Sequence, residues 1–379
     1  MKKSLIAILI LASLFSFALY AFDFGGSFSN FTGLTLVKPS VGLDQDNSLT
    51  LWLRTPLGKN GYFATEGGYT FSYDGSSKEI TNQLDISLLK ANWTFNTNAG
   101  KVTLDVGRFI SSDCTGVIFN QNSDGFLASF NSDNFSLFGL ASYTGLLNAH
   151  GTSYYYDNTS IDYTKLYPLS PKYLIGGLAA TFPFLFAEQS LTSEVWAFID
   201  VNGNPAPYNR IMATLSLNGN ITSSLFYTFS DTVCYDSLIS DLAMANLTYF
   251  MEKLNSSVNL SFALATGSNS DPQKKIGGFT PFDLITCDAA GTKAYDGIIK
   301  IGLSGTCQPT AKFLLSGGFD YLMSYDDKYK TDGVQWSATA LWQLFSDMEL
   351  SLTASHFIPL AESTSSTYFQ AQAGIVISF

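Results

Sequence analysis

The chain has only two histidines, so its options for acid–base and nucleophilic chemistry are few. His150 is followed by Gly151 and Thr152 and lacks the serine two residues later that a His-x-Ser hydrolase pattern needs, and His356 directly follows Ser355. We interpret both as loop or interface histidines. We therefore expect no catalytic residue and a protein that is not an enzyme.

Metal and cofactor chemistry has as little support in the sequence. The four cysteines, Cys114, Cys234, Cys287 and Cys307, lie far apart and form no ligand spacing with a histidine. An acidic stretch such as Asp44 to Asp46 could hold a divalent cation, but solvated loop charge is the simpler interpretation. No glycine-rich phosphate-binding pattern follows a predicted strand and opens a helix. We expect no metal site and no cofactor.

Two long segments carry side chains suited to solute recognition, 145–172 and 267–294. The first contains Tyr154, Tyr155 and Tyr156, and the second contains Phe279 and Phe282. Aromatic rings offer flat surfaces on which sugars or apolar solutes can stack. Either segment could fold inward as a constriction or lid, and an exposed, variable loop is the equally weighted alternative.

The elements that would hold these segments are β-strands. Apolar and polar residues alternate at period two in 18 runs separated by turn sequences. Leu49, Leu51 and Leu53 oppose Thr50, Trp52 and Arg54 in one such run. The runs are 25–37, 47–54, 62–73, 80–95, 101–109, 125–131, 134–144, 173–182, 191–200, 209–217, 221–230, 240–253, 257–266, 295–304, 311–325, 334–344, 349–357 and 368–379.

The connections between these strands alternate in length. Connections on one predicted side are short, whereas 145–172 and 267–294 both fall on the other side, together with 110–124, 201–208 and 231–239. This sorting predicts an up-and-down barrel with short inner turns and long outer loops. It places Cys307 in the inner turn 305–310 and the other three cysteines outside. A disulfide within the outer three and four free thiols both stay open.

The composition agrees with a membrane barrel. Charged residues make up only 13% of the chain, and no apolar run reaches the roughly 20 residues of a spanning helix. Residues 1–21 read as a signal peptide, which leaves 22–379 as one barrel domain. Its removal would take two lysines from a net charge of −11 and leave −13. Such an acidic chain is not expected to bind nucleic acid, and it favours a modest preference for cations.

The last strand carries a further motif. Gln372, Gly374, Ile377 and the terminal Phe379 stand at the spacing of the sorting signal on the last strand of bacterial outer-membrane barrels. The chain thus resembles the porin-like β-barrel superfamily. The resemblance implies an outer-membrane location, contact with outer-membrane lipid and handling by the barrel-assembly machinery. A weaker similarity links Gly107-Arg108 and Asp124-Gly125 to alginate-export-type barrels.

We therefore expect an all-β, transmembrane antiparallel barrel of about 18 strands, with 16 as the next choice. Its expected function is passive or weakly selective diffusion of small hydrophilic solutes, and it could form a homo-oligomer. A substrate-specific uptake or export channel, or a surface protein that binds ligands or host cells through its outer loops, is the alternative. The side chains expected to line the pore are Arg54, Glu66, Asp105, Glu194, Arg210, Lys300, Lys312, Asp320 and Glu349.

Overall fold

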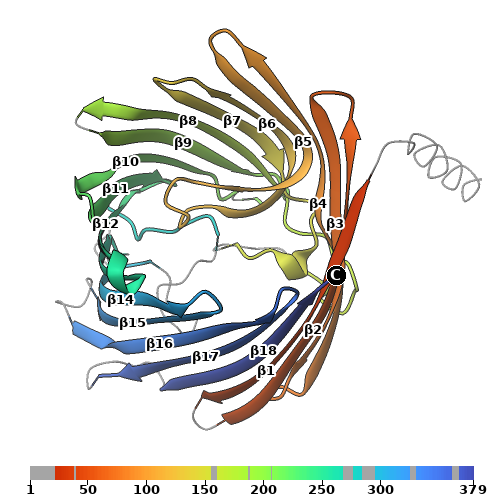
Figure 1. The fold of residues 1–379 in the computed structure, drawn as a ribbon, viewed down its shortest axis with the longest axis vertical. Coiled ribbons are helices and arrows are strands. Elements are labelled where there is room, and N and C mark those ends of the chain that lie inside the picture. The colour runs from red at the N-terminus through yellow and green to blue at the C-terminus, as the bar shows by residue number, and fades with distance from the viewer. Residues whose placement is uncertain are drawn as a thin grey trace, which may run out of the picture.

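The computed structural model describes residues 22–37, 40–154, 160–186, 188–205, 207–267, 276–283, 295–324, 330–360 and 367–379. These residues form one antiparallel sheet of 18 strands in which each strand pairs with its sequence neighbours and β1 pairs with β18. The sheet is therefore a closed barrel (Figure 1). The prediction of 18 strands is confirmed, and the 16-stranded alternative is wrong.

The strand bounds are as follows. They are β1 Asp23–Val37, β2 Ser40–Leu57, β3 Gly61–Asp74, β4 Glu79–Thr97, β5 Gly100–Ser112, β6 Asn120–Asn131, β7 Ser136–Tyr143, β8 Tyr173–Phe186, β9 Gln189–Asp200, β10 Arg210–Thr222, β11 Leu225–Tyr235, β12 Ile239–Met251, β13 Ser256–Ala265, β14 Ile298–Thr310, β15 Phe313–Ser324, β16 Lys330–Phe345, β17 Met348–Pro359 and β18 Tyr368–Ser378. The helices among the described residues are two short 3-10 turns, Ala149–Gly151 (η1) and Glu252–Leu254 (η2), and neither is long and apolar enough to cross a membrane.

Several strands are longer than predicted. β14 continues to Thr310, so the predicted inner turn 305–310 is strand and Cys307 lies within it, paired in register with Ser256. β11 likewise includes Cys234. The strand ends were missed because, toward the end of a barrel strand, water can touch both faces and the alternation of apolar and polar residues fades. Cys114, Cys234 and Cys307 are free thiols, and Cys287 lies outside the described residues.

The closing pair of strands meets tightly. Phe31 of β1 stands opposite Gly374 of β18, and a Cβ on Gly374 would lie 2.2 Å from the Phe31 ring. The terminal Phe379 exchanges two backbone hydrogen bonds with Gly26, of 2.8 and 2.9 Å. Both edges of the sheet are thereby removed, and the described strands leave no free edge.

Candidate functional site

β5 and β6 separate from the barrel wall before they reach the turn that connects them. Pairing of β4 with β5 stops at Leu89 and Arg108, and pairing of β6 with β7 stops at Asp124 and Tyr143. Pairing between β5 and β6 nevertheless continues to Ser112 and Asn120. The hairpin 109–123 therefore separates from both neighbouring strands and reaches into the barrel (Figure 1).

An ion pair stands at the point where the hairpin leaves the wall. Arg108 and Asp124 face each other in register, and the guanidinium donates two parallel hydrogen bonds, Nε to Oδ1 at 2.9 Å and Nη2 to Oδ2 at 2.8 Å. The preceding Gly107 has φ +119°, a conformation that side chains other than glycine rarely adopt, and it lets β5 change direction. Because Arg108 shares its parity with Val106, the sequence predicts a position near the outer interface, where the side chain can snorkel, or beyond a bulge. In the structure its side chain is buried.

The described residues of the connection between β7 and β8, 144–154 and 160–172, fill the gap left by the hairpin. Leu84 of β4 donates its N–H to Leu166 O at 3.1 Å and accepts from Asn148 Nδ2 at 2.8 Å. Arg108 also donates to Leu146 O and to the Tyr167 hydroxyl, each at 2.8 Å. The wall is thus completed by a segment that sequence reasoning treated only as a possible lid or an exposed loop.

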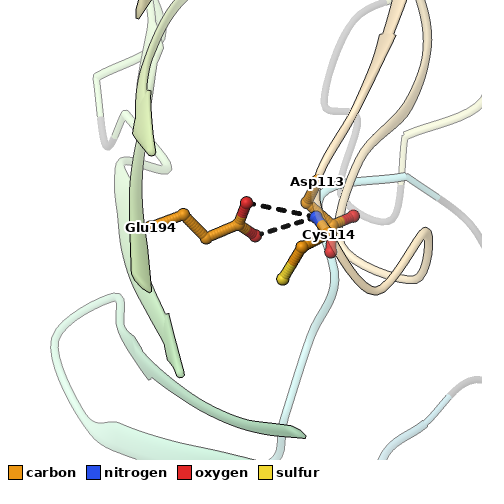
Figure 2. A group of neighbouring side chains, drawn as sticks. All are labelled: Asp113, Cys114 and Glu194. Carbon is orange, nitrogen blue, oxygen red and sulfur yellow. Dashed lines mark hydrogen bonds between the residues drawn. The ribbon is translucent and has the colours of Figure 1, made fainter. Parts of the chain in front are cut away.

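The tip of the inward hairpin is held by carboxylates. Asp113 accepts hydrogen bonds from the N–H groups of Ile118 and Phe119, at 3.0 and 2.9 Å, which order the turn. The N–H of Cys114 donates to both oxygens of Glu194, each at 3.1 Å, so β9 holds the tip (Figure 2).

Asp113, Cys114 and Glu194 bring three possible metal-ligand atoms within 4.8 Å of one another, an arrangement that sequence spacing did not indicate because Glu194 is remote in the chain. Their carboxylate oxygens already accept N–H donors. The cluster therefore acts as a clasp for the hairpin tip.

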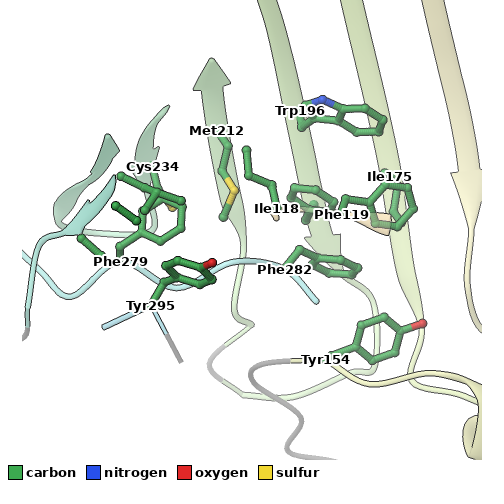
Figure 3. Packing of buried hydrophobic residues seen from close by; sticks show 14 of the residues in the cluster. Ile118, Phe119, Tyr154, Ile175, Trp196, Met212, Cys234, Phe279, Phe282 and Tyr295 are labelled. Atoms are coloured by element: carbon green, nitrogen blue, oxygen red, sulfur yellow. The ribbon is translucent and has the colours of Figure 1, made fainter. Parts of the chain in front are cut away.

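Aromatic rings join the hairpin to a second inward segment, 276–283. Phe119 lies 5.4 Å from Trp196 and 5.9 Å from Phe282, measured between ring centroids. Phe282 stacks on Phe198 at 4.1 Å. It also contacts the Tyr154 ring at 5.0 Å (Figure 3). We call residues 113–119, Tyr154 and 276–283 the constriction cluster.

Asp283 ties the two inward segments together. Its N–H and that of Phe282 donate to Ile118 O at 3.1 and 3.0 Å, and its Oδ2 accepts from Asn120 N at 2.5 Å. Its Oδ1 is buried without a hydrogen-bond partner among the described residues. Burial, with repulsion from Asp113, raises the pKa of this carboxyl to about 7, although the Asn120 N–H and Arg210 act in the opposite direction.

Arg210 of β10 lies beneath this second segment. It is 1% exposed and donates through Nη1 to the carbonyl oxygens of Thr280 and Pro281 at 3.3 and 2.5 Å. Its guanidinium carbon lies 4.6 Å from the Tyr208 ring centroid and 5.1 Å from that of Phe282. Within the described part of the chain, Nε and Nη2 have no hydrogen-bond partner and no carboxylate lies at ion-pair distance. This buried cation is balanced mainly by carbonyl dipoles and aromatic faces.

The nine predicted pore-lining residues fall into four groups by their surroundings. Glu194 and Arg210 adjoin the constriction cluster. Lys300 pairs with Asp320 at 3.2 Å across β14 and β15, while Asp105 pairs with Lys90 at 3.3 Å. Glu66 accepts from Ser87 Oγ at 2.6 Å, and Arg54 stacks on Tyr62 at 4.0 Å. Lys312 lies in the turn after β14 and Glu349 near the start of β17.

Three of the five predicted loop aromatics are buried. Tyr154, Phe279 and Phe282 pack inside the barrel and leave little free ring surface for a solute, while Tyr155 and Tyr156 lie outside the described residues. Sequence reasoning missed Asp113, Phe119, Asp283 and the roles of Arg108 and Asp124. One available signal was the placement of Gly107-Arg108 and Asp124-Gly125 symmetrically about Gly116, as expected for cross-strand partners in one hairpin.

No protein-family model matches this chain, and no curated protein matches it. Solved structures do match, over nearly all of both chains. OccK2 (OpdF) of Pseudomonas aeruginosa aligns with 9% identity over 94% of this chain and 97% of that chain, with a TM-score of 0.64. OccK5 (OpdH) and the outer membrane protein OpdK of the same organism align with 11% and 10% identity, each over 94% of this chain and 98% of theirs, with TM-scores of 0.61 and 0.62.

At these identities the matches establish the fold, a closed barrel shared with bacterial outer-membrane proteins. A second structure of OccK2 (OpdF), in complex with glucuronate, aligns with 11% identity over 94% of this chain and 98% of that chain, with a TM-score of 0.61.

Proposed function

We propose that this chain is an outer-membrane channel through which small hydrophilic solutes diffuse passively. The observation that carries the proposal is a polar, water-accessible inner wall in a closed barrel. The side chains of Lys300 and Asp320 keep 22% and 21% of their surface exposed although they lie on the inner face. Barrels of 16 to 18 strands leave an aqueous lumen, and here the constriction cluster narrows it from one side.

Planar-bilayer recording of the refolded full chain tests this proposal. We expect stepwise conductance increases in salt solution. Barrel formation is checked independently by heat-modifiable gel mobility. A barrel that inserts but never conducts would remove the channel proposal and leave the surface-binding alternative.

A substrate-specific channel is the second candidate, and we propose acidic sugars as its solute class. The supporting observation is the buried cation Arg210, which has no carboxylate partner among the described residues. The glucuronate complex of OccK2 (OpdF) and the similarity of Gly107-Arg108 and Asp124-Gly125 to alginate-export barrels point to the same class of solute. Movement of the segment 276–283 would present the guanidinium to a carboxylate.

Liposome swelling separates these two candidates. A weakly selective pore should pass glucose and glucuronate at similar rates, whereas the specific channel should favour glucuronate and lose that preference in Arg210→Met. A channel specific for acidic sugars should also prefer anions, whereas the acidic net charge of the chain predicts a modest preference for cations. A reversal potential measured in a salt gradient decides between the two signs.

Two further proposals concern how the protein reaches and assembles in the outer membrane. We propose that residues 1–21 are removed as a signal peptide and that Gln372, Gly374, Ile377 and Phe379 guide assembly. Intact mass measurement of the protein from outer membranes tests the first assignment, because the processed chain should begin at Phe22. The nine predicted pore-lining residues keep that role as a prediction, to be checked by cysteine accessibility from the aqueous side.

A further inference from the structure

The outward face of β1 and β2 is apolar except for a group of polar side chains, three of which are amides. Phe28 and Leu34 of β1 and Leu43 and Leu49 of β2 are exposed on the outside of the barrel. Between them, on the same face, lie Asn30 and Thr32 of β1 and Gln45 and Asn47 of β2, which are register partners in pairs. We call these four residues the amide patch.

The amide patch lies inside the hydrocarbon band. Asn30 pairs in register with Ile375 of β18, which stands between the outward-facing Phe369 and Phe379 of the same strand. The ten residue steps from Phe369 to Phe379 span about 25 Å at ~3.3 Å per residue and a tilt of ~40°, the height of the apolar band of such barrels. Ile375, the register partner of Asn30, lies four residues from Phe379, the inner of the two phenylalanines. Asn30 is therefore close to the middle of the membrane.

Hydrogen bonds within the barrel satisfy only part of the patch. Asn30 Nδ2 donates to Asn47 Oδ1 at 2.6 Å. The other polar atoms of these two amides, and the whole amide of Gln45, have no partner among the described residues. Acyl chains can neither donate nor accept, so polar groups at this depth favour contact with another protein.

The surface beside the patch has room for a neighbour. Small side chains, including Ala338, Ala354 and Ala371, line a shallow depression of about 540 Å³ across β15 to β18, β1 and β2. Thr32 and Leu34 belong both to its rim and to the face that carries the patch. The depression supplies apolar contact area, while the amides supply hydrogen-bonding groups.

We propose that a second copy of this chain docks on the amide patch. Each amide both donates and accepts, so the patch is complementary to itself. Two copies related by an axis along the membrane normal bring identical patches together at identical depth, as in most symmetric oligomers. An unrelated membrane protein would need a matching polar group at this same depth by coincidence.

The test uses full-length protein in outer membranes, with the native cysteines replaced by serine and one lipid-facing cysteine added. Leu34→Cys places the thiol beside the patch. Leu215→Cys, also lipid-facing and exposed, places it on β10, nine strands away around the ring. A short bifunctional thiol reagent should join two copies through Leu34→Cys and not through Leu215→Cys. Equal yields at both positions, no dimer, or a cross-link to a different protein would overturn the proposal.

The same strands provide a matched control for the amides. Asn30→Leu combined with Asn47→Leu should lower the dimer yield from Leu34→Cys by about tenfold, since it removes the bridging hydrogen bonds. Ser29 and Ser48 form a hydroxyl pair at 2.7 Å on the lumen face one residue away, so Ser29→Ala with Ser48→Ala should leave that yield unchanged. Heat-modifiable mobility confirms that each variant has formed its barrel. A dimer yield unaffected by the leucine substitutions would show that the amides do not form the interface.

Discussion

Arg108 and Asp124 form a bidentate ion pair at the level where the β5–β6 hairpin turns out of the barrel wall into the lumen. The same guanidinium also donates to Ile86 O of β4 and to Leu146 O of the segment that closes the gap. One side chain thereby connects the departing hairpin, the strand it leaves and the segment that replaces it. The wall and the constriction depend on the same contact.

Replacing Arg108 with Met should therefore affect stability and conductance together. Removing one partner of a buried ion pair leaves an uncompensated charge and lowers the free energy of unfolding by about 3–5 kcal/mol. Looser attachment of the hairpin should also make single-channel currents noisier. Denaturant titration and planar-bilayer recording measure the two effects.

The exposed pair Lys165–Asp162 is the control for that substitution. Its charged groups lie 3.6 Å apart, and the side chains are 66% and 53% exposed. Lys165→Met should leave the free energy of unfolding nearly unchanged, because solvent screens an exposed ion pair. If Arg108→Met behaved like this control, the ion pair would not hold the hairpin.

The constriction should loosen as the pH rises through about 7. Asp283 has its pKa raised from 3.8 to about 7 when buried in the closed cluster. A raised pKa means that the contribution of this group to the closed arrangement is full below its ordinary pKa and is lost as the pH passes the raised value. Conductance should therefore be larger at about pH 8 than at about pH 5.

Asp283→Asn cannot ionise and keeps an oxygen that can accept from Asn120 N–H. Its conductance should show no such increase between the two pH values. A pH response in the variant as large as that of the parent would assign the titration to another group.

Gly374→Ala should hinder closure of the barrel, because its new methyl group would overlap the Phe31 ring. The yield of heat-modifiable, folded protein should fall, and Phe31→Ala in the same chain should restore it. Gly176→Ala is the control, since nothing lies within 4 Å of its Cβ position. If Phe31→Ala did not restore the yield of folded protein, the defect of Gly374→Ala would not come from overlap with the Phe31 ring.

Deleting Phe379 should reduce the amount of assembled protein in the outer membrane and leave the conductance of the assembled channels unchanged. The residue lies at the inner end of the closing strand, where it pairs with Gly26 through backbone atoms and points away from the lumen. Quantitative surface labelling with single-channel recording separates the two effects. Normal surface levels would contradict the assembly role.

The number and order of the strands could be predicted because period-two alternation is a local property. Each strand of a barrel has its own lipid face and lumen face, so Leu49 opposite Thr50 is informative without knowledge of any partner strand. The same rule predicts that Lys300 and Asp320 share one face of the sheet, and their side chains form an ion pair.

The sequence by itself thus determined the closed barrel, its 18 strands, the side on which long connections lie and the seam between β1 and β18. Only the tertiary structure decided that the β5–β6 hairpin turns inward and that residues around Leu146, Asn148 and Leu166 take its place in the wall. It also decided that Arg210 lies over the Phe282 ring and that Asp283 ties the hairpin to the segment 276–283. These contacts join residues far apart in the chain, such as Cys114 with Glu194 or Asn120 with Asp283. They depend on packing in the enclosed lumen, and no periodicity along the chain encodes such packing.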